Sequence, residues 1–328
     1  MSGFNLIQTK EAYGETLLEL GTSNPDIFVV EADLMKASGS KQFMLKFPDR
    51  HINVGVAEQN LVSIAAGLAV MGRIPFACTM SNFLSQRACD QVFLGAAYNA
   101  LNVKLVGCYS GLSQGKNGGT HISLMDFAIM RILPKMKVIA PSDIRELKEV
   151  LVTVSKDTGP TYIHLPRSLP ENIFDSSYIF KINNAYVRGD GADLTIICNG
   201  LTTFIAFRAQ EALEKENINA RVLHIPTIKP ADRKLIIRCA IETGAILTVE
   251  NHSTCGGLGG LISEIVTEEF PVPVFRIGIN NQFGLTADLE FQLQYFGISI
   301  ENIQAKAREL INFKNKIGQR RKELKYYG

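Results

Sequence analysis

Glu58 is the first residue whose type and position suggest chemistry. It lies in PDRHINVGVAEQNLVSIAAGLAVMG at 48–72, where Leu61, Ala65 and Leu68 mark an apolar helical stripe. Glu58 falls on the same face in the first helical turn, because residues three and four apart are neighbours on a helix. A carboxyl group on a buried face must be paired or protonated, and could then exchange a proton with a ligand. An exposed glutamate that complements the helix dipole fits the same spacing, so both interpretations remain open.

Two further features follow the ends of expected strands. Phe83 opens a helical stretch, where it could be a core aromatic or a platform for a flat heteroaromatic ring. The loop Ser110–His121 (SGLSQGKNGGTH) has four glycines in twelve residues, so its backbone can approach a ligand closely. His121 closes this loop at the edge where open α/β sheets bind ligands, which favours a binding role over a structural one. Arg167 also follows a strand, and could meet an anion or a surface carboxylate.

Alternating strands and helices must position these residues. Short apolar runs, typical of strands buried on both faces, alternate with stretches of helical spacing. In the first half the expected strands are Ile27–Ala32, Ile74–Thr79, Val103–Tyr109, Val138–Ala140 and Thr161–Leu165, and the expected helices are Thr9–Leu20, 57–71, 84–100 and 143–156. In the second half the expected strands are Leu194–Cys198, Arg221–Ile225, Ile246–Glu250 and Val272–Ile277, and the expected helices are 202–216, 232–242 and 258–269. We therefore expect an α/β protein with two doubly wound domains, a parallel-sheet domain at 1–170 and a smaller one at 192–328, joined by a surface linker at 171–191.

Composition excludes several classes of protein. The 328 residues are 46% hydrophobic and 20% charged with a formal net charge of +2, which gives no electrostatic reason to expect a nucleic-acid partner. No apolar run approaches the ~20 residues that a membrane-spanning helix needs. The six cysteines form no CxxC pair and the N-terminus carries no signal pattern, so we expect reduced thiols and a cytoplasmic protein. The basic tail Lys314–Tyr327 is interpreted as a solvated helix face or a frayed end.

Seven segments, in order and spacing, are similar to transketolase and cover nearly the whole chain. They are EADL at 31–34, FPDRHINVGVAEQNLVSIAAGLA at 47–69, RACDQ at 87–91, GGTH at 118–121, KVIAPSD at 137–143, GPTYIHLPRS at 159–168 and TVENHSTCGGLGG at 248–260. The resemblance covers the family's pyrimidine-binding domain (1–170) and C-terminal domain (192–328), with no counterpart of its diphosphate-binding domain. It therefore implies the C-terminal half of a split, two-subunit transketolase.

The resemblance also implies roles for individual residues. It places Glu58 on the aminopyrimidine ring of thiamine diphosphate, with Phe83 stacked on that ring. A buried glutamic acid can share its proton with a pyrimidine nitrogen, which activates the cofactor. The resemblance also places Asp33 at the reacting centre beside the cofactor, where His121 would donate a hydrogen bond to the developing charge of the substrate. Arg167 is placed at the phosphate end of a sugar. Glu58 and His121 are thus the expected catalytic residues.

A function and a set of partners follow from the resemblance. The reaction would transfer a two-carbon ketol unit from a ketose or ketose phosphate to an aldose or aldehyde, as in the pentose phosphate reactions of carbohydrate metabolism. The cofactor would be thiamine diphosphate with Mg²⁺ or another divalent ion, bound mainly by the partner subunit. That partner would be a diphosphate-binding N-terminal transketolase subunit, in a heterotetramer with two copies of each.

Several positions depart from the family pattern. Thr9 stands at the family's first-helix arginine, Tyr109 at a histidine that begins the substrate loop, Asn117 at an acidic residue and Met80 at an aromatic one. Tyr109 and Asn117 remain candidate substrate-binding residues. Since the expected cofactor residues are kept while the sugar-phosphate residues change, the departures leave the substrate open. An unusual ketose or aldehyde with a different anionic group fits the pattern.

Two glycine motifs are interpreted as structural. Gly189–Asp190–Gly191 has the letters of the thiamine diphosphate metal motif, but it precedes the expected strand Leu194–Cys198 instead of following a buried strand. We assign it to the linker and expect no metal ligand in this chain. The run Gly256–Gly260 (GGLGG) opens a helix, where an anion could bind, but close backbone packing is the favoured interpretation.

Other interpretations remain. The beta subunit of a 2-oxo-acid dehydrogenase has the same two domains and a similar glutamate, but it lacks the GGTH pattern and binds a lipoyl carrier protein. Deoxyxylulose-phosphate synthase is also close, but normally keeps all its domains on one chain. A non-catalytic regulatory partner with the thiamine fold is a different class, and the presence of Glu58, Phe83 and His121 argues against it.

Overall fold

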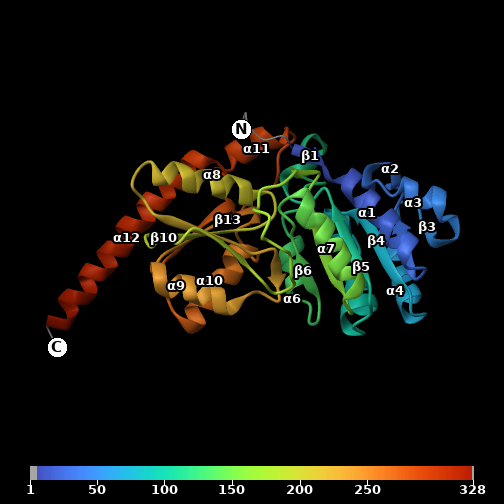
Figure 1. Ribbon diagram of the computed structural model, residues 1–328, viewed down its shortest axis with the longest axis horizontal. Helices are drawn as coiled ribbons and strands as arrows, with labels where there is room; N and C mark the ends of the chain where they lie inside the picture. Colours follow the sequence, from blue (N-terminus) through green and yellow to red (C-terminus); the bar gives the residue numbers. More distant parts are fainter. Residues whose placement is uncertain (1–5, 327–328) are drawn as a thin grey trace.

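A seven-stranded sheet forms the centre of the first domain (Figure 1). The computed structural model describes the backbone of residues 6–326 and the side chains of residues 6–319. The strand order is β12–β6–β7–β5–β4–β2–β3. The strands are β2 (Ile27–Glu31), β3 (His51–Asn53), β4 (Ile74–Met80), β5 (Lys104–Cys108), β6 (Lys137–Ile139), β7 (Thr161–Leu165) and β12 (Thr227–Lys229). All of these pair in parallel except β12, which runs antiparallel to β6 and comes from the second half of the chain.

Helices cover both faces of this sheet, as doubly wound domains require. One face packs on α1 (Thr9–Ser23) and α7 (Ile144–Lys156), and the other on α4 (Glu58–Val70) and α6 (Asp126–Ile132). The prediction of a single α-helix at 84–100 is wrong. It is divided into a π-helix η2 (Phe83–Arg87), α5 (Cys89–Val92) and a second π-helix η3 (Phe93–Tyr98). Such wide turns concentrate at functional sites.

The second domain has a five-stranded sheet in the order β14–β13–β10–β11–β9. Its strands are β9 (Tyr186–Arg188), β10 (Leu194–Cys198), β11 (Ala220–His224), β13 (Ile246–Ser253) and β14 (Val274–Ile279). On one face lie α8 (Thr202–Glu214) and α12 (Ile300–Tyr326), and on the other α9 (Arg233–Thr243) and α10 (Leu258–Glu269). A short helix, α11 (Leu289–Tyr295), precedes α12. The far end of α12 extends away from the body (Figure 1), and the side chains of the basic tail from residue 320 onward lie outside the described part.

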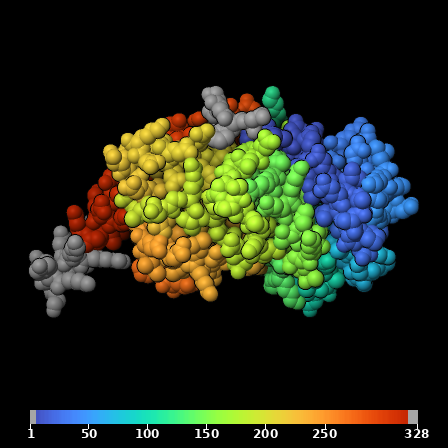
Figure 2. Space-filling model, in the orientation of Figure 1, coloured from blue at the N-terminus to red at the C-terminus, as the bar shows by residue number. Residues whose placement is uncertain are grey.

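The predicted linker does more than cross the surface. Phe174 and Tyr178 are buried in the hydrophobic core of the second domain, and Phe180 in that of the first. The end of this segment forms β9, which pairs antiparallel with β11. At its start, β8 (Ser168–Pro170) pairs with β1 (Leu6–Gln8) in a separate two-stranded sheet. The space-filling view shows the two domains in contact on the face drawn (Figure 2). Among the described helices, none combines the length and apolar character needed to cross a bilayer.

Candidate active site

Glu58 is buried at the first turn of α4, on the same face as Leu61, Ala65 and Leu68. Only 3% of its side chain is exposed, so the alternative of a solvated first-turn glutamate is wrong. Its Oε2 accepts a hydrogen bond from Arg87 Nη1 at 2.8 Å, and this ion pair compensates the burial of the carboxylate. Arg87 itself is 43% exposed. The carboxyl group therefore lies at the edge of the core, beneath a cation that reaches solvent.

Phe83 and His121 meet beside this ion pair. The ring centroids of Phe83 and His121 are 5.1 Å apart in an edge-to-face contact, and the Arg87 guanidinium lies 4.1 Å from the centre of the Phe83 ring. A cavity of about 490 Å³ opens over them. Its lining consists of Asn82, Phe83, Gln86, Arg87, Thr120 and His121. Phe83 is only half-buried and faces this cavity, so it is not a core aromatic.

The π-helix η2 and the glycine-rich loop bring these side chains together. Phe83 and Arg87 are four residues apart in η2, which places both on one side of it. Asn82 Nδ2 donates a hydrogen bond to the Thr120 carbonyl at 2.6 Å, which joins the start of η2 to the end of the loop. The His121 N–H donates to the Gly118 carbonyl at 3.0 Å, and the Thr120 hydroxyl lies 3.0 Å from His121 Nδ1. The orientation of His121 is therefore fixed by its own loop and by η2.

Tyr109 and Arg167 form a second group at the other end of the loop. They line a small recess at the carboxyl ends of β5 and β7, together with Gln8, Thr9, Lys10, Ala37, Ser38, Cys108 and Leu165. The Arg167 guanidinium lies 5.6 Å from the centre of the Tyr109 ring. The Tyr109 hydroxyl donates to the Ala37 carbonyl at 3.3 Å, and burial raises the pKa of this phenol, so it remains a neutral donor. The Thr9 hydroxyl donates a hydrogen bond to the Pro166 carbonyl at 2.7 Å.

Asp33 and Asn117 line neither of these two recesses. Asp33 is exposed beyond the end of β2 with a left-handed φ of 59°, which is uncommon for a residue other than glycine. Its backbone N–H donates to Asn53 Oδ1 at 3.0 Å, and Asn53 Nδ2 donates back to Asp33 Oδ1 at 3.2 Å. Asn117 is exposed at the end of the 3₁₀-helix η4 (Leu112–Asn117). Any contact of these two residues with a ligand stays a prediction.

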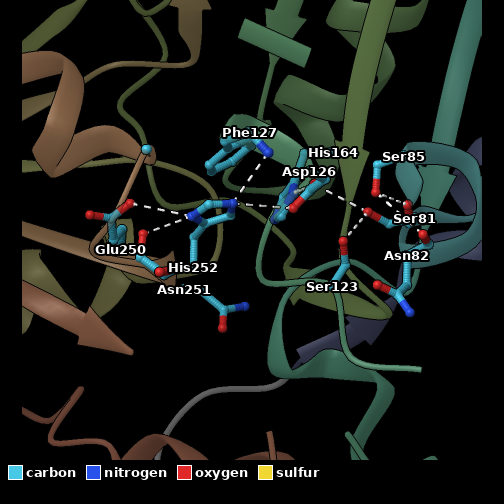
Figure 3. Close-up of polar contacts among 12 residues, drawn as sticks. Ser81, Asn82, Ser85, Ser123, Asp126, Phe127, His164, Glu250, Asn251 and His252 are labelled. Carbon is cyan, nitrogen blue, oxygen red and sulfur yellow. Dashed lines mark hydrogen bonds and ion pairs between the residues drawn. The ribbon is translucent and has the colours of Figure 1, made fainter. Parts of the chain in front are cut away.

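Sequence reasoning missed Arg87 and a buried polar cluster between the domains (Figure 3). Arg87 stands in the RACDQ segment, four residues after Phe83, and this spacing was the available signal. In the cluster, Asp126 Oδ2 accepts hydrogen bonds from His164 Nδ1 and the Tyr162 hydroxyl, both at 2.6 Å, and from the Ser81 hydroxyl at 3.1 Å. Although burial opposes ionisation, the neighbouring His164 and these donors hold the pKa of Asp126 below its usual range.

His252 joins this cluster from β13 of the second domain. Its Nε2 accepts a hydrogen bond from the Phe127 N–H at 3.2 Å, and its Nδ1 donates to the Ser253 carbonyl at 2.8 Å. Burial lowers the pKa of His252, so the ring is neutral. It accepts one hydrogen bond from the first domain and donates one within the second. The Ser81 hydroxyl oxygen also lies 2.8 Å from the hydroxyl of Ser123, two residues after His121. The cluster therefore reaches the end of the glycine-rich loop.

The two glycine motifs, Gly256–Gly260 and Gly189–Gly191, contact other parts of the chain. The N–H groups of Leu258 and Gly259, at the start of α10, donate to the two oxygens of Glu250 at 2.7 and 2.9 Å. A carboxyl group of the chain itself thus fills the position that an external anion would take, and burial raises the pKa of Glu250 to about 8. The Gly189–Gly191 turn joins β9 to β10, with Asp190 exposed. Within the described residues, no three acidic, histidine or cysteine side chains gather as a metal site.

The cavity suits one part of thiamine diphosphate. Phe83 and His121 line the cavity, and the buried carboxyl group of Glu58 lies behind Arg87, which also lines it. Together these groups match the chemistry of an aminopyrimidine ring. Each can contribute acid–base exchange, stacking or hydrogen bonding. The residues present therefore fit the pyrimidine side of the cofactor. Among the residues that the structure describes, no group of acidic, histidine or cysteine side chains could bind the divalent ion that would hold the diphosphate.

Comparison with known proteins gives the family. The family model for the transketolase pyrimidine-binding domain matches residues 5–171, and that for the transketolase C-terminal domain matches residues 183–303. A relative from Clostridium sp. (strain MSTE9), the 6-deoxy-6-sulfo-D-fructose transketolase subunit SqwH, is 39% identical over 93% of this chain and 95% of its own length. A putative transketolase C-terminal section from Methanocaldococcus jannaschii is 39% identical over 92% of this chain and 95% of its own. Human transketolase is 37% identical over 93% of this chain but only 49% of its own length.

Solved structures agree with these matches. A split-gene transketolase, described as an inactive beta4 tetramer, superposes with a TM-score of 0.85 at 36% identity, covering 94% of this chain and all of that one. The transketolase of Leishmania mexicana superposes with a TM-score of 0.80 at 24% identity, covering 95% of this chain and 46% of that one, and supports the fold alone. The chain belongs to the transketolase family and consists of that family's pyrimidine-binding and C-terminal domains.

Proposed function

We propose that this chain is the subunit of a split, thiamine-diphosphate-dependent transketolase that supplies the pyrimidine-side catalytic residues. The observation that carries the proposal is the buried carboxyl group of Glu58 beside the accessible ring of Phe83 and the imidazole of His121. Thiamine diphosphate, when bound, supplies the carbon nucleophile that breaks and forms the carbon–carbon bond of ketol transfer. The chain supplies proton exchange, ring stacking and substrate hydrogen bonds.

Glu58 is the proposed proton-exchanging group. Arg87 contacts Oε2 of its carboxyl group, so Oε1 is the oxygen that would meet a ring nitrogen of the aminopyrimidine. The pair must rearrange or loosen when the carboxyl group takes up a proton, because a guanidinium only donates hydrogen bonds and favours an ionised partner. Arg87, at 43% exposure, has room to move into solvent.

A partner subunit is part of the proposal. Exposed apolar side chains flank α4: Val56, two residues before Glu58, is 72% exposed, and Val70 and Met71, at the other end of the helix, are 72% and 67% exposed. Such a surface on a globular protein marks an interaction site. The partner would be the diphosphate-binding subunit, which would hold the diphosphate and its divalent ion in a heterotetramer with two copies of each chain. The similar split-gene protein is described as inactive when it is a beta4 tetramer, which fits this division of labour.

The proposed substrate is a ketose with a terminal anionic group. Arg167 and Lys10 give the second recess its positive charge. The hydroxyl groups of Tyr109 and Thr9 also line it, although both now donate to the backbone carbonyls of Ala37 and Pro166. Sulfonates and phosphates share this chemistry, since both present tetrahedral oxygens to cations and hydroxyl groups. Two relatives are named for such sugars, one for 6-deoxy-6-sulfo-D-fructose and one for apulose-4-phosphate, which supports the proposal.

Reconstitution tests the proposal. The chain is mixed with a diphosphate-binding transketolase subunit, thiamine diphosphate and Mg²⁺, and ketol transfer from phosphorylated, sulfonated and neutral ketoses is measured. We expect turnover only when both subunits are present, with a preference for anionic donors. Turnover by the chain alone would refute the partner requirement. Decarboxylation of 2-oxo acids with a lipoyl carrier, in place of ketol transfer, would refute the reaction.

A further inference from the structure

The glycine-rich loop is pressed against a segment of the C-terminal domain. A Cβ atom added to Gly119 would lie 2.7 Å from the Gly284 carbonyl oxygen, and one added to Gly118 would lie 2.6 Å from Thr286 Oγ1. In the opposite direction, a Cβ atom on Gly284 would lie 2.5 Å from Ile122 Cδ1. These separations are shorter than van der Waals contact. Several of the loop glycines are thus needed for packing between domains, in addition to any approach to a ligand.

The segment that presses on the loop, residues 283–287, is itself fixed. The buried side chain of Gln292 on α11 accepts a hydrogen bond from the Leu285 N–H at 3.0 Å and donates one to the Ala287 carbonyl at 3.1 Å. Asp288 caps the same helix by accepting from the Phe291 N–H at 2.9 Å. The segment is therefore anchored to α11, so its position can determine the positions of the residues that it contacts.

Strand β13 holds the rest of the loop. Asn251 Oδ1 accepts from the Leu112 N–H at 3.0 Å near the start of the loop, and the Ser253 N–H donates to the Leu124 carbonyl at 3.3 Å just after it (Figure 3 shows Asn251 beside the cluster of His252). The side chains of Leu112, Ile122 and Leu124 are buried in the hydrophobic core of the second domain. Residues on both sides of His121 are thus packed as part of the C-terminal domain.

We propose that the C-terminal domain is a positioning element of the active site, in which segment 283–287 and strand β13 set the place of His121 against Phe83. This inference rests on the proposed substrate role of His121 and adds to it. The C-terminal domain supplies no side chain to the lining of the cavity. It acts through the backbone of the loop whose last residue is His121. Gly284, Gln292 and Asn251 are accordingly positioning residues.

Gly284→Ala tests the proposal in the reconstituted enzyme, because its added methyl group must displace Ile122 and with it His121. A displacement of about 1 Å can cost ~10²-fold in rate, so we expect kcat/KM for the ketose to fall roughly 10- to 100-fold. The affinity for thiamine diphosphate should not change, since Glu58 and Phe83 lie on other elements. Gly259→Ala is the matched control. Its Cβ would be equally crowded, at 2.7 Å from Arg276 Cδ, but within the C-terminal domain and away from the loop.

A double-mutant cycle with His121→Ala separates positioning from general damage. If the segment acts through His121, adding Gly284→Ala to His121→Ala should reduce kcat/KM further by less than about threefold, because coupled residues are not additive. Gln292→Ala releases the segment without adding atoms, and should give the same pattern if Gly284→Ala does not fold.

Each outcome bears on one claim. Full additivity of the two changes, or an equal loss in Gly259→Ala, would overturn the positioning role. If His121→Ala alone leaves kcat/KM unchanged, that result would instead contradict the proposed role of His121 itself. Loss of cofactor affinity in Gly284→Ala would also overturn the inference, because the segment would then act on the cofactor side of the site.

Discussion

Replacement of Glu58 by glutamine should remove the acid–base function while keeping the site intact. Glutamine has nearly the same size, and its amide oxygen can still accept the hydrogen bond that Arg87 Nη1 now donates to Oε2 at 2.8 Å. It cannot release and recover a proton, so the aminopyrimidine ring would lose its partner. The change tests one chemical step with little change in packing.

The expected magnitudes follow from the surroundings of Glu58. Acid–base groups commonly contribute ~10²–10⁴-fold, and we expect a loss near the upper end because cofactor activation precedes every later step. The stability change should be small. The Glu58–Arg87 pair has one partner 43% exposed, so the guanidinium can recover hydration when the carboxylate charge is lost. Glutamine leaves no uncompensated buried charge and keeps a hydrogen bond, whose net worth is about 1 kcal/mol, so the Tm shift should be a few degrees at most.

The direct assay is exchange of the thiazolium proton with deuterated solvent, followed by proton NMR on the assembled complex. We expect exchange to slow by orders of magnitude in Glu58→Gln, with circular dichroism and subunit assembly unchanged. An exchange rate within a few-fold of the parent would fall far short of acid–base catalysis. Glu58 would then not be the activating group, and the interpretation of the cavity would be wrong.

Three further results are expected. His121→Ala should lower turnover far more than cofactor affinity, since His121 is the proposed hydrogen-bond donor to the substrate while Phe83 remains in the lining of the cavity. Steady-state kinetics and cofactor titration measure the two effects, and weaker cofactor binding with unchanged kinetics would contradict this role. Arg167→Ala should raise KM for anionic ketoses by roughly 10-fold or more, as loss of a charged hydrogen bond of about 1.5–3 kcal/mol implies, and should leave neutral ketoses unaffected. Finally, calorimetry on the isolated chain should detect no tight binding of thiamine diphosphate with Mg²⁺, and micromolar affinity would refute the division of the site between subunits.

The regular elements were predictable because hydrophobic runs and helical spacing are local signals. Strands β7 and β10 have the predicted bounds, Thr161–Leu165 and Leu194–Cys198, and both are buried throughout. The helix expected at 84–100 failed because periodicity does not distinguish an α-helix from one interrupted by π turns. Strand β12 was missed because three residues acquire strand structure only by pairing with β6, some 90 residues earlier in the chain.

The contacts within the site were less predictable than the residues that make them. Glu58 could be placed on an apolar face from spacing alone, but the ion pair with Arg87 joins residues 29 positions apart. The glycines of Ser110–His121 suggested close approach to a ligand. In the structure Gly118 and Gly119 also meet residues 283–287 of the C-terminal domain, and no local pattern in the sequence indicates this contact.

The glycine-rich loop connects the two recesses, and in our proposal it links the substrate-recognising end of the site to the end that would hold the cofactor. Tyr109 and Arg167 lie at its beginning, and His121 lies at its end beside Phe83. If the first recess binds the anionic group, as we propose, substitutions there would alter which group is recognised without changing the side chains that line the cavity over Phe83. The loop must nevertheless be stiff for the two ends to act on one molecule, because a substrate anchored at Arg167 is productive only if His121 is held at a fixed place. The loop packs on the C-terminal domain. In our proposal this packing provides the stiffness, so the second domain would act on catalysis indirectly, although none of its side chains lines the cavity.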